Sequence, residues 1–289
     1  MKYECGKNDA GLMIKDVLKR RMNFSTRLIR KLKEVGGVDL NRVPSKLNVT
    51  VRVGDVISVS FPEERSDFEP QDIPLEVVYE DDDLLIINKQ PGIVVHPTKG
   101  HPVGTVANAL AWRMKEKDDY FRIRFVNRLD MDTSGLLIVA KNAFAQESFQ
   151  QQMRANTTVK QYWALVDGIL GSEEGEIDLP IGIVDEEAVG RAVTPDGYPS
   201  LTRFRVLDYP GGGRTLVELT LETGRTHQIR VHMSYIGYPV TGDSLYGSQS
   251  PDIGRQALHS KRLEFDHPIT GERICVEAPL PEDMERLLK

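Results

Sequence analysis

Hydrophobic positions in the first sixty residues follow a helical spacing and then an alternating one. Apolar residues within 13–18 recur every three or four positions and predict a short amphipathic helix. A second predicted helix begins at Ser25, a favourable N-cap residue, and ends at Gly36. Residues 51–53, a Gly-Asp turn and the alternating residues 56–61 together predict a β-hairpin. This part of the chain is therefore expected to contain two helices followed by two paired strands.

The rest of the chain alternates short apolar runs with amphipathic segments. Residues 63–74 are acidic, contain two prolines and are expected to form a linker. Beyond the linker, short apolar runs predict strands, and apolar residues at helical spacing predict helices. The predicted strands cover residues 76–79, 84–87, 136–140 and 160–168, and the predicted helices cover residues 105–114 and 142–156.

A polar stretch, residues 127–135, opens directly onto the apolar run 136–140, and its last three residues, Thr-Ser-Gly, are expected to form the turn between them. Asp130 and Asp132 are therefore expected on a loop held against a buried strand, where a rigid scaffold can position a reactive carboxylate. An aspartate in a turn more often caps the backbone than reacts. The string Asp-x-Asp-x-Ser-Gly that begins at Asp130 also looks like the start of a calcium-binding loop. That loop requires a bidentate glutamate at its twelfth position, where this chain has Lys141. Calcium binding is not expected.

The string Arg-Leu-Asp-x-x-Thr-Ser-Gly before an apolar strand resembles the central motif of the RluA/RluD family of RNA pseudouridine synthases. That family usually has histidine where this chain has Asn127. Residues 89–97 resemble its first motif, with one glutamine that looks inserted, and residues 221–232 match its last strong motif. The Gly-Asp-x-x-Tyr-Gly string at 242–247 also follows the family pattern. The motifs occur in the family's order, and the resemblance covers about residues 75–289.

The resemblance implies an α+β fold, in which the catalytic domain has a large mixed, mainly antiparallel sheet. It also implies that Asp130 is the catalytic carboxylate, that Arg230 pairs with it and keeps it ionised, and that Tyr162 stacks on a flipped uracil. Arg128 would occupy the place that the flipped uridine leaves. Whether Asp130 acts as a nucleophile or as a base stays open. Pseudouridine formation adds no group to the RNA, so neither a cofactor nor a metal is expected.

Histidines and cysteines are the residues that could suggest a metal. His227 and His232 lie five positions apart, so they would point to opposite faces of a strand or lie about 140° apart on a helix. A shared zinc ion is therefore not expected. The two cysteines, Cys5 and Cys275, form no CxxC pair and predict neither a zinc site nor a disulfide framework.

Charge is distributed unevenly along the chain. The net charge is −6, but residues 1–65 carry 14 Lys/Arg against 8 Asp/Glu, a net of +6, and residues 66–289 carry the other −12. Such asymmetry points to a nucleic-acid surface better than the total does. The helix–helix–strands pattern of residues 10–62 resembles the S4 RNA-binding domain. The basic face of its second helix comprises Arg27, Arg30 and Lys31. This face is expected to contact RNA; the alternative is that it is merely solvated, as charged faces usually are.

The chain is accordingly expected to comprise an S4-like domain in residues 1–62, a linker in 63–74 and a catalytic domain in 75–289. The expected activity is isomerisation of uridine in structured RNA, with large-subunit ribosomal RNA favoured and tRNA left open. The alternatives are a non-catalytic RNA-binding or ribosome-assembly factor on the same fold, and another RNA base enzyme such as a transglycosylase. The sequence has no apolar leader and no apolar run of about 18 residues, so a cytoplasmic monomer that does not bind membranes is expected.

Overall fold

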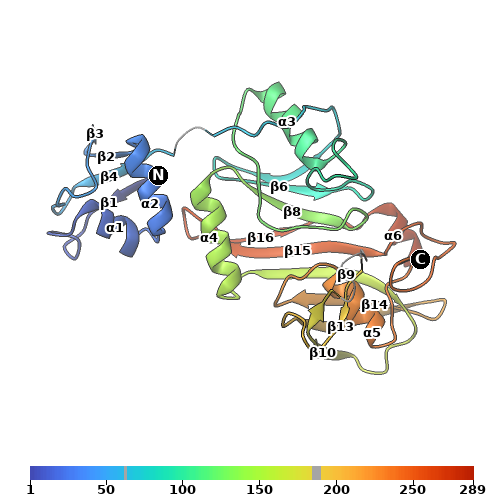
Figure 1. Cartoon of the computed structure of the whole chain (residues 1–289). Helices are drawn as coiled ribbons and strands as arrows, with labels where there is room; N and C mark the ends of the chain where they lie inside the picture. The colour runs from blue at the N-terminus through green and yellow to red at the C-terminus, as the bar shows by residue number, and fades with distance from the viewer. Residues whose placement is uncertain (62–63, 184–189) are drawn as a thin grey trace.

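The computed structural model describes residues 1–61, 64–183 and 190–289. Its N-terminal part, blue in Figure 1, packs two helices against a four-stranded antiparallel sheet of order β1-β4-β2-β3. Both predicted helices are confirmed. Ser25 Oγ accepts a hydrogen bond from the Leu28 amide at 3.1 Å at the start of α2, and Gly36, left-handed at φ 70°, ends it. The elements of this part are β1 (Lys2–Glu4), α1 (Ile14–Arg20), α2 (Thr26–Val35), β2 (Val38–Leu40), β3 (Val43–Pro44) and β4 (Val56–Val59).

The predicted hairpin over residues 51–61 is wrong. Only its second half is a strand, β4, and this strand pairs with β1 on one side and with β2 on the other. Val51 is buried, and its backbone bonds to the loop before α1: its amide donates to Leu12 O at 2.9 Å, and its carbonyl accepts from the Gly11 amide at 3.0 Å. The apolar residues that suggested a first hairpin strand therefore contact a segment far earlier in the chain, which a local pattern cannot reveal.

A ten-stranded sheet forms the larger part of the molecule and crosses the centre of Figure 1. Eight strands follow the order β10-β13-β14-β9-β15-β8-β6-β5, while β16 pairs with β15 and β7 pairs with β8. Of the described pairs in this sheet, only β8 and β15 run parallel. The predicted mixed, mainly antiparallel sheet is thus confirmed.

The strands of this part are β5 (Glu76–Glu80), β6 (Leu84–Lys89), β7 (Arg124–Phe125), β8 (Ser134–Ala140), β9 (Val159–Asp167), β10 (Glu174–Asp178), β11 (Ile181–Gly182), β12 (Ala192–Val193), β13 (Leu201–Gly211), β14 (Arg214–Leu221), β15 (Leu258–Asp266) and β16 (Arg273–Glu277). Its helices are α3 (Val106–Lys117), α4 (Ala143–Arg154), α5 (Gln228–Tyr235) and α6 (Glu282–Leu287). The predicted helices at 105–114 and 142–156 are confirmed as α3 and α4.

Strand β8 is buried on both faces, as its unbroken apolar run predicts. Leu137 and Val139 lie in a core shared with helix α3, whereas Leu136 and Ile138 lie in a second core with Phe149 of α4. The loop that precedes β8 is therefore attached to a strand that is fixed from both sides.

The segment expected to be a linker lies along the catalytic part. Residues 64–74 contain no helix or strand, and Phe68 and Ile73 pack against the large core. Glu64 forms ion pairs with cations before and after the segment, namely Lys31, Arg122 and Arg124. The segment is therefore held at its beginning by charge and further along by apolar packing.

The N-terminal part contacts the catalytic part at helix α4. The rings of Phe24, Phe61 and Phe144 cluster with centroids 4.6–6.2 Å apart, and Ser25 Oγ donates to a Glu147 carboxylate oxygen at 2.7 Å. None of the described helices has the length and apolar character that a membrane span requires. The domain boundaries, the monomeric state and the cellular compartment stay predictions.

Candidate active site

The loop between β7 and β8 carries Asp130 and is fixed through its backbone. The Thr133 amide donates to Asp130 O at 3.1 Å, and the next two residues already belong to β8. The predicted Thr-Ser-Gly turn is therefore wrong in position, because β8 begins earlier than its apolar run.

The Asn127 side chain bonds to the backbone of β8 as a neighbouring strand would. Its Nδ2 donates to Leu136 O at 3.1 Å, and its Oδ1 accepts from the Ile138 amide at 2.8 Å. The departure from the family's histidine thus has a structural use.

Two buried basic side chains hold the residues that follow Asp130. Arg255 Nη1 donates to Asp132 O at 2.9 Å. Lys89 Nζ, which is wholly buried, donates at 2.8–3.1 Å to the backbone carbonyls of Gln90, Ile93 and Met131. Burial lowers the pKa of Lys89 to about 7. Neither residue has a role predicted from the sequence, although Lys89 opens the motif at 89–97.

Replacing Gly135 with Ala is expected to weaken the fold where β8 meets β15. Gly135 has φ +107°, and an added Cβ would lie 2.3 Å from Ser260 O, so the backbone would have to move. We expect the free energy of unfolding to fall by about 2–4 kcal/mol. The matched control is Gly212→Ala, because Gly212 also has positive φ, +64°, but has nothing within 4 Å of an added Cβ. Urea unfolding of both variants checks this, and equal losses would contradict it.

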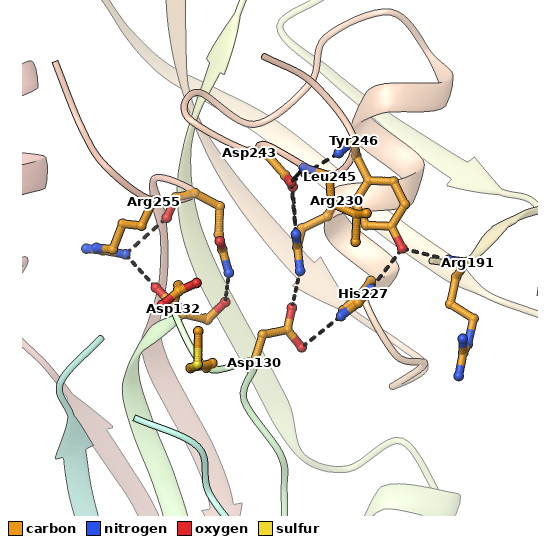
Figure 2. A network of polar contacts seen from close by, with 12 residues as sticks. Asp130, Asp132, Arg191, His227, Arg230, Asp243, Leu245, Tyr246 and Arg255 are labelled. Atoms are coloured by element: carbon orange, nitrogen blue, oxygen red, sulfur yellow. Dashed lines mark hydrogen bonds and ion pairs between the residues drawn. The ribbon is translucent and has the colours of Figure 1, made fainter. Parts of the chain in front are cut away.

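Arg230, on helix α5, bridges two carboxylates (Figure 2). Its Nη1 donates to Asp130 Oδ2 at 3.1 Å, while its Nε and Nη2 donate to the two oxygens of Asp243 at 2.7 and 2.9 Å. Burial disfavours the charged form of Arg230, but the hydrogen bonds and charges of Asp243 and Asp130 outweigh it and raise its pKa. Arg230 therefore stays cationic and lies where the predicted ion pair requires it.

Asp243 is a site residue that has no role predicted from the sequence. Its side chain is wholly buried, and its Oδ1 also accepts from the amides of Leu245 and Tyr246 at 3.0 and 3.2 Å. Burial opposes ionisation, but the bonds from Arg230 and these amides outweigh it and lower the pKa of Asp243. The carboxylate fixes the guanidinium from behind. The Gly-Asp-x-x-Tyr-Gly string was the signal that could have pointed to it.

His227 and Tyr246 lie beside the other oxygen of Asp130. His227 Nε2 is 3.8 Å from Asp130 Oδ1, and His227 Nδ1 is 2.8 Å from Tyr246 Oη. The Tyr246 ring also lies over the Arg230 guanidinium, at 5.1 Å from its centroid. Each oxygen of the Asp130 carboxylate therefore has a nitrogen group within 4 Å.

A cavity of about 440 Å³ is lined by all three predicted catalytic residues, namely Asp130, Tyr162 and Arg230. Tyr162 lies on β9, and burial raises its pKa to about 12, so its hydroxyl is protonated at neutral pH. Lys160 lines the same cavity from the same face of β9, two residues earlier. Burial lowers the pKa of Lys160. The cavity thus combines one carboxylate, one phenol and several cations.

A larger groove of about 990 Å³ lies between the N-terminal part and the catalytic part. Phe125, Arg128 and Leu129 line both the groove and the cavity, so the two adjoin each other. Arg128 is exposed at this junction. The predicted basic face of α2 divides here: Arg27 and Lys31 line the groove, whereas Arg30 is not among the lining residues.

The structure separates the two histidines of the last motif. His232 lies on α5, and its buried side chain is within hydrogen-bond distance, 2.9 Å, of both Thr202 Oγ1 and Leu179 O. His227 faces Asp130 instead. Among the described residues, one group, Asp81, Asp83 and His267, has oxygen and nitrogen atoms close enough for a shared ion. These three residues already hydrogen-bond to protein groups, including His267 Nε2 to Asp81 Oδ2 at 2.9 Å.

Comparison with known proteins places this geometry in a class. The family model described as RNA pseudouridylate synthase matches residues 83–235. A Bacillus subtilis protein named as the uncharacterized RNA pseudouridine synthase YjbO is 41% identical over 93% of this chain and 95% of its own. Ribosomal large subunit pseudouridine synthase D of Vibrio vulnificus is 43% identical over 85% of this chain and 79% of its own. The solved structure of human RNA pseudouridylate synthase domain containing 1 matches with a TM-score of 0.60 and 31% identity, over 71% and 83% of the two chains.

These matches show that the chain belongs to the RNA pseudouridylate synthases, and within them to the RluA/RluD family whose motifs it carries. The predicted α+β fold and the predicted enzyme class, an isomerase that acts on RNA, are confirmed.

Proposed function

We propose that this protein isomerises uridine in large-subunit ribosomal RNA, with Asp130 as the reacting carboxylate. The observation that carries the proposal is the Arg230–Asp130 ion pair on the wall of a cavity that Tyr162 also lines. Several relatives of about 40% identity are named for the large ribosomal subunit, which favours this RNA over tRNA.

The reaction requires one carboxylate and no added group. The N1–C1′ bond of uridine breaks, the uracil rotates, C5 bonds to C1′, and the hydrogen lost from C5 is balanced by one gained at N1. Asp130 can attack C1′ as a nucleophile or remove a sugar proton as a base. Among the described residues that line the cavity, Asp130 is the one carboxylate, whereas glycoside hydrolases generally use two. The site therefore suits isomerisation better than hydrolysis.

Tyr162 and Arg128 would handle the flipped nucleotide. A uridine must leave its stack to reach Asp130, and an aromatic ring on the cavity wall can stack on its base. The protonated hydroxyl of Tyr162 can donate or relay a hydrogen, but it is not a ready base at neutral pH. Arg128, exposed where the groove meets the cavity, can fill the vacated place in the RNA.

The groove provides an RNA path in a chain whose net charge is −6. Its lining cations outnumber its two carboxylates, Glu64 and Glu147. These cations are Arg27, Lys31, Arg122, Arg124, Arg128 and Arg154. Lys31, Arg122 and Arg124 lie against Glu64, so Arg27 and Arg154 are the lining cations most available for backbone phosphates at a distance from Arg128.

Replacing Arg27 and Arg154 together with Gln is expected to weaken RNA binding and reduce its salt dependence. Each phosphate contact releases counterions, so losing two should flatten the slope of log K against log salt by about two units on a duplex. Arg30→Gln, on the same helix as Arg27 but outside the groove, is the matched control. Titrations at several salt concentrations check this. A double variant with the slope of the control would mean that the groove does not hold RNA.

The target can be identified from pseudouridine maps of ribosomal and transfer RNA. The maps would come from cells with the gene, without it, and with only the Asp130→Asn variant. We expect a large-subunit position to lose its pseudouridine in both mutant strains. Loss confined to tRNA would overturn the ribosomal target. Unchanged maps together with defective ribosomes in the strain without the gene would favour a non-catalytic ribosome-assembly factor. Release of isotope from C5 of uridine distinguishes isomerisation from base exchange.

A further inference from the structure

His227 has an uncommon backbone conformation beside the proposed catalytic carboxylate. It precedes α5 at φ 58° and ψ 19°, in the left-handed region that a residue with a side chain seldom adopts. Its side chain makes no capping bond to the helix. Instead, its ring meets the Tyr246 ring edge-on at 5.5 Å and presents Nε2 to Asp130 (Figure 2).

The Tyr246 hydroxyl favours one of the two ring nitrogens of His227 as the carrier of the hydrogen. The backbone amide of Arg191 donates to Tyr246 Oη at 2.7 Å, and an amide N–H can only donate. The hydroxyl still has its own hydrogen to donate, and among the described residues His227 Nδ1, 2.8 Å away, is the acceptor placed to receive it. A neutral imidazole that accepts at Nδ1 carries its hydrogen at Nε2. The opposite tautomer would aim an Nε2 lone pair at the Asp130 carboxylate, so both ends of the ring favour the same form.

The surroundings also keep the imidazole neutral. Burial lowers the pKa of His227, and the positive charges of Arg230 and Arg191 act in the same direction. Asp130 and Asp243 oppose them without reversing the shift. Burial also raises the pKa of Tyr246, so its hydroxyl keeps the hydrogen that it donates.

We propose that His227 is a positioning residue: as the Nε2–H tautomer, which Tyr246 favours, it orients Asp130 by donating to Oδ1. The proposal rests on the proposed role of Asp130. Arg230 makes one hydrogen bond to Oδ2. One hydrogen bond does not fix the plane of the carboxylate. The 3.8 Å separation is longer than a hydrogen bond and would shorten when RNA fills the cavity, since such contacts often tighten in the substrate complex. A neutral donor orients the carboxylate without placing a second positive charge beside it.

His227→Asn tests the contact, because asparagine tolerates the left-handed backbone but cannot present Nε2. We expect the single-turnover rate at saturating RNA to fall by about 10- to 100-fold, with RNA affinity and the unfolding midpoint little changed.

Tyr246→Phe should lower the single-turnover rate less than His227→Asn does. It should also move the acid side of the rate–pH profile to higher pH, because losing the hydroxyl donor raises the pKa of His227 and an imidazolium then forms beside Asp130. Tyr235→Phe, an exposed tyrosine at the end of α5, is the control.

Nitrogen NMR of ring-labelled histidine gives a readout that is independent of activity. The His227 signals, assigned by their loss in His227→Asn, should show hydrogen on Nε2 at pH 7 in the full chain, and a tautomer mixture in Tyr246→Phe. An Nδ1–H form or an imidazolium in the wild type would overturn the proposal, as would a wild-type rate for His227→Asn. If Asp130→Asn kept its activity, the proposed function would fail while the tautomer result stood by itself.

Discussion

Replacing Asp130 with Asn is expected to abolish pseudouridine formation while leaving the fold and the affinity for RNA nearly unchanged. The amide has the shape of the carboxylate, but it is neither basic nor usefully nucleophilic, so the rate should fall by at least about 10²–10⁴-fold. Arg230 keeps its two bonds to Asp243, so the buried guanidinium stays paired in the variant. Single-turnover release of isotope from C5 of labelled uridine measures the loss.

Asp132→Asn is the matched control, two residues away in the same loop. The loop uses the backbone carbonyl of Asp132, which accepts from Arg255, and its side chain does not line the cavity. Its activity should stay near that of the wild type. Turnover by Asp130→Asn above a few per cent of wild type would remove Asp130 from its proposed role, and equal losses in both variants would point to damage to the loop.

The positions of Asp130, Tyr162 and Arg230 could be predicted because each lies in a motif with a recognisable order of residues. Their common cavity could not be predicted from spacing, since Asp130 and Arg230 lie far apart in the chain and meet only through the sheet and α5. Asp243 illustrates what was missed. A buried aspartate that fixes an arginine has no local pattern of its own, and its role follows from which guanidinium it faces.

In the fold, too, the features set by neighbouring residues could be predicted, whereas those set by residues distant in the chain could not. Ser25 and Gly36 mark the ends of α2 because capping acts within a few residues, and the apolar run of β8 predicts burial on both faces. The hairpin failed because the partners of β4 are β1 and β2, and strand pairing over long distances leaves no local signal. The parallel contact of Gly135 with β15 is equally invisible in the sequence.

Replacing Arg230 with Ala is expected to damage the chemical step far more than replacing Arg225, the other arginine of the same motif. Arg230 bonds to both Asp130 and Asp243, whereas Arg225 is exposed, donates to Pro199 O at 3.3 Å and makes no bond to either carboxylate. Removing Arg230 leaves the wholly buried Asp243 without its partner, which should lower the free energy of unfolding by about 3–5 kcal/mol. Single-turnover rates and urea unfolding of both variants measure the two effects.

A double variant separates the catalytic loss from the loss of stability. Arg230→Ala combined with Asp243→Asn removes the unpaired buried charge, while the asparagine oxygen can still accept from the amides of Leu245 and Tyr246. Much of the lost stability should therefore return, because the buried charge is the main cause of that loss. Activity should not return, because Asp130 still lacks the cation that pairs with it and orients it. If the double variant regained wild-type turnover, Arg230 would be a structural residue only, and a near wild-type rate in Arg230→Ala itself would refute the ion-pair role directly.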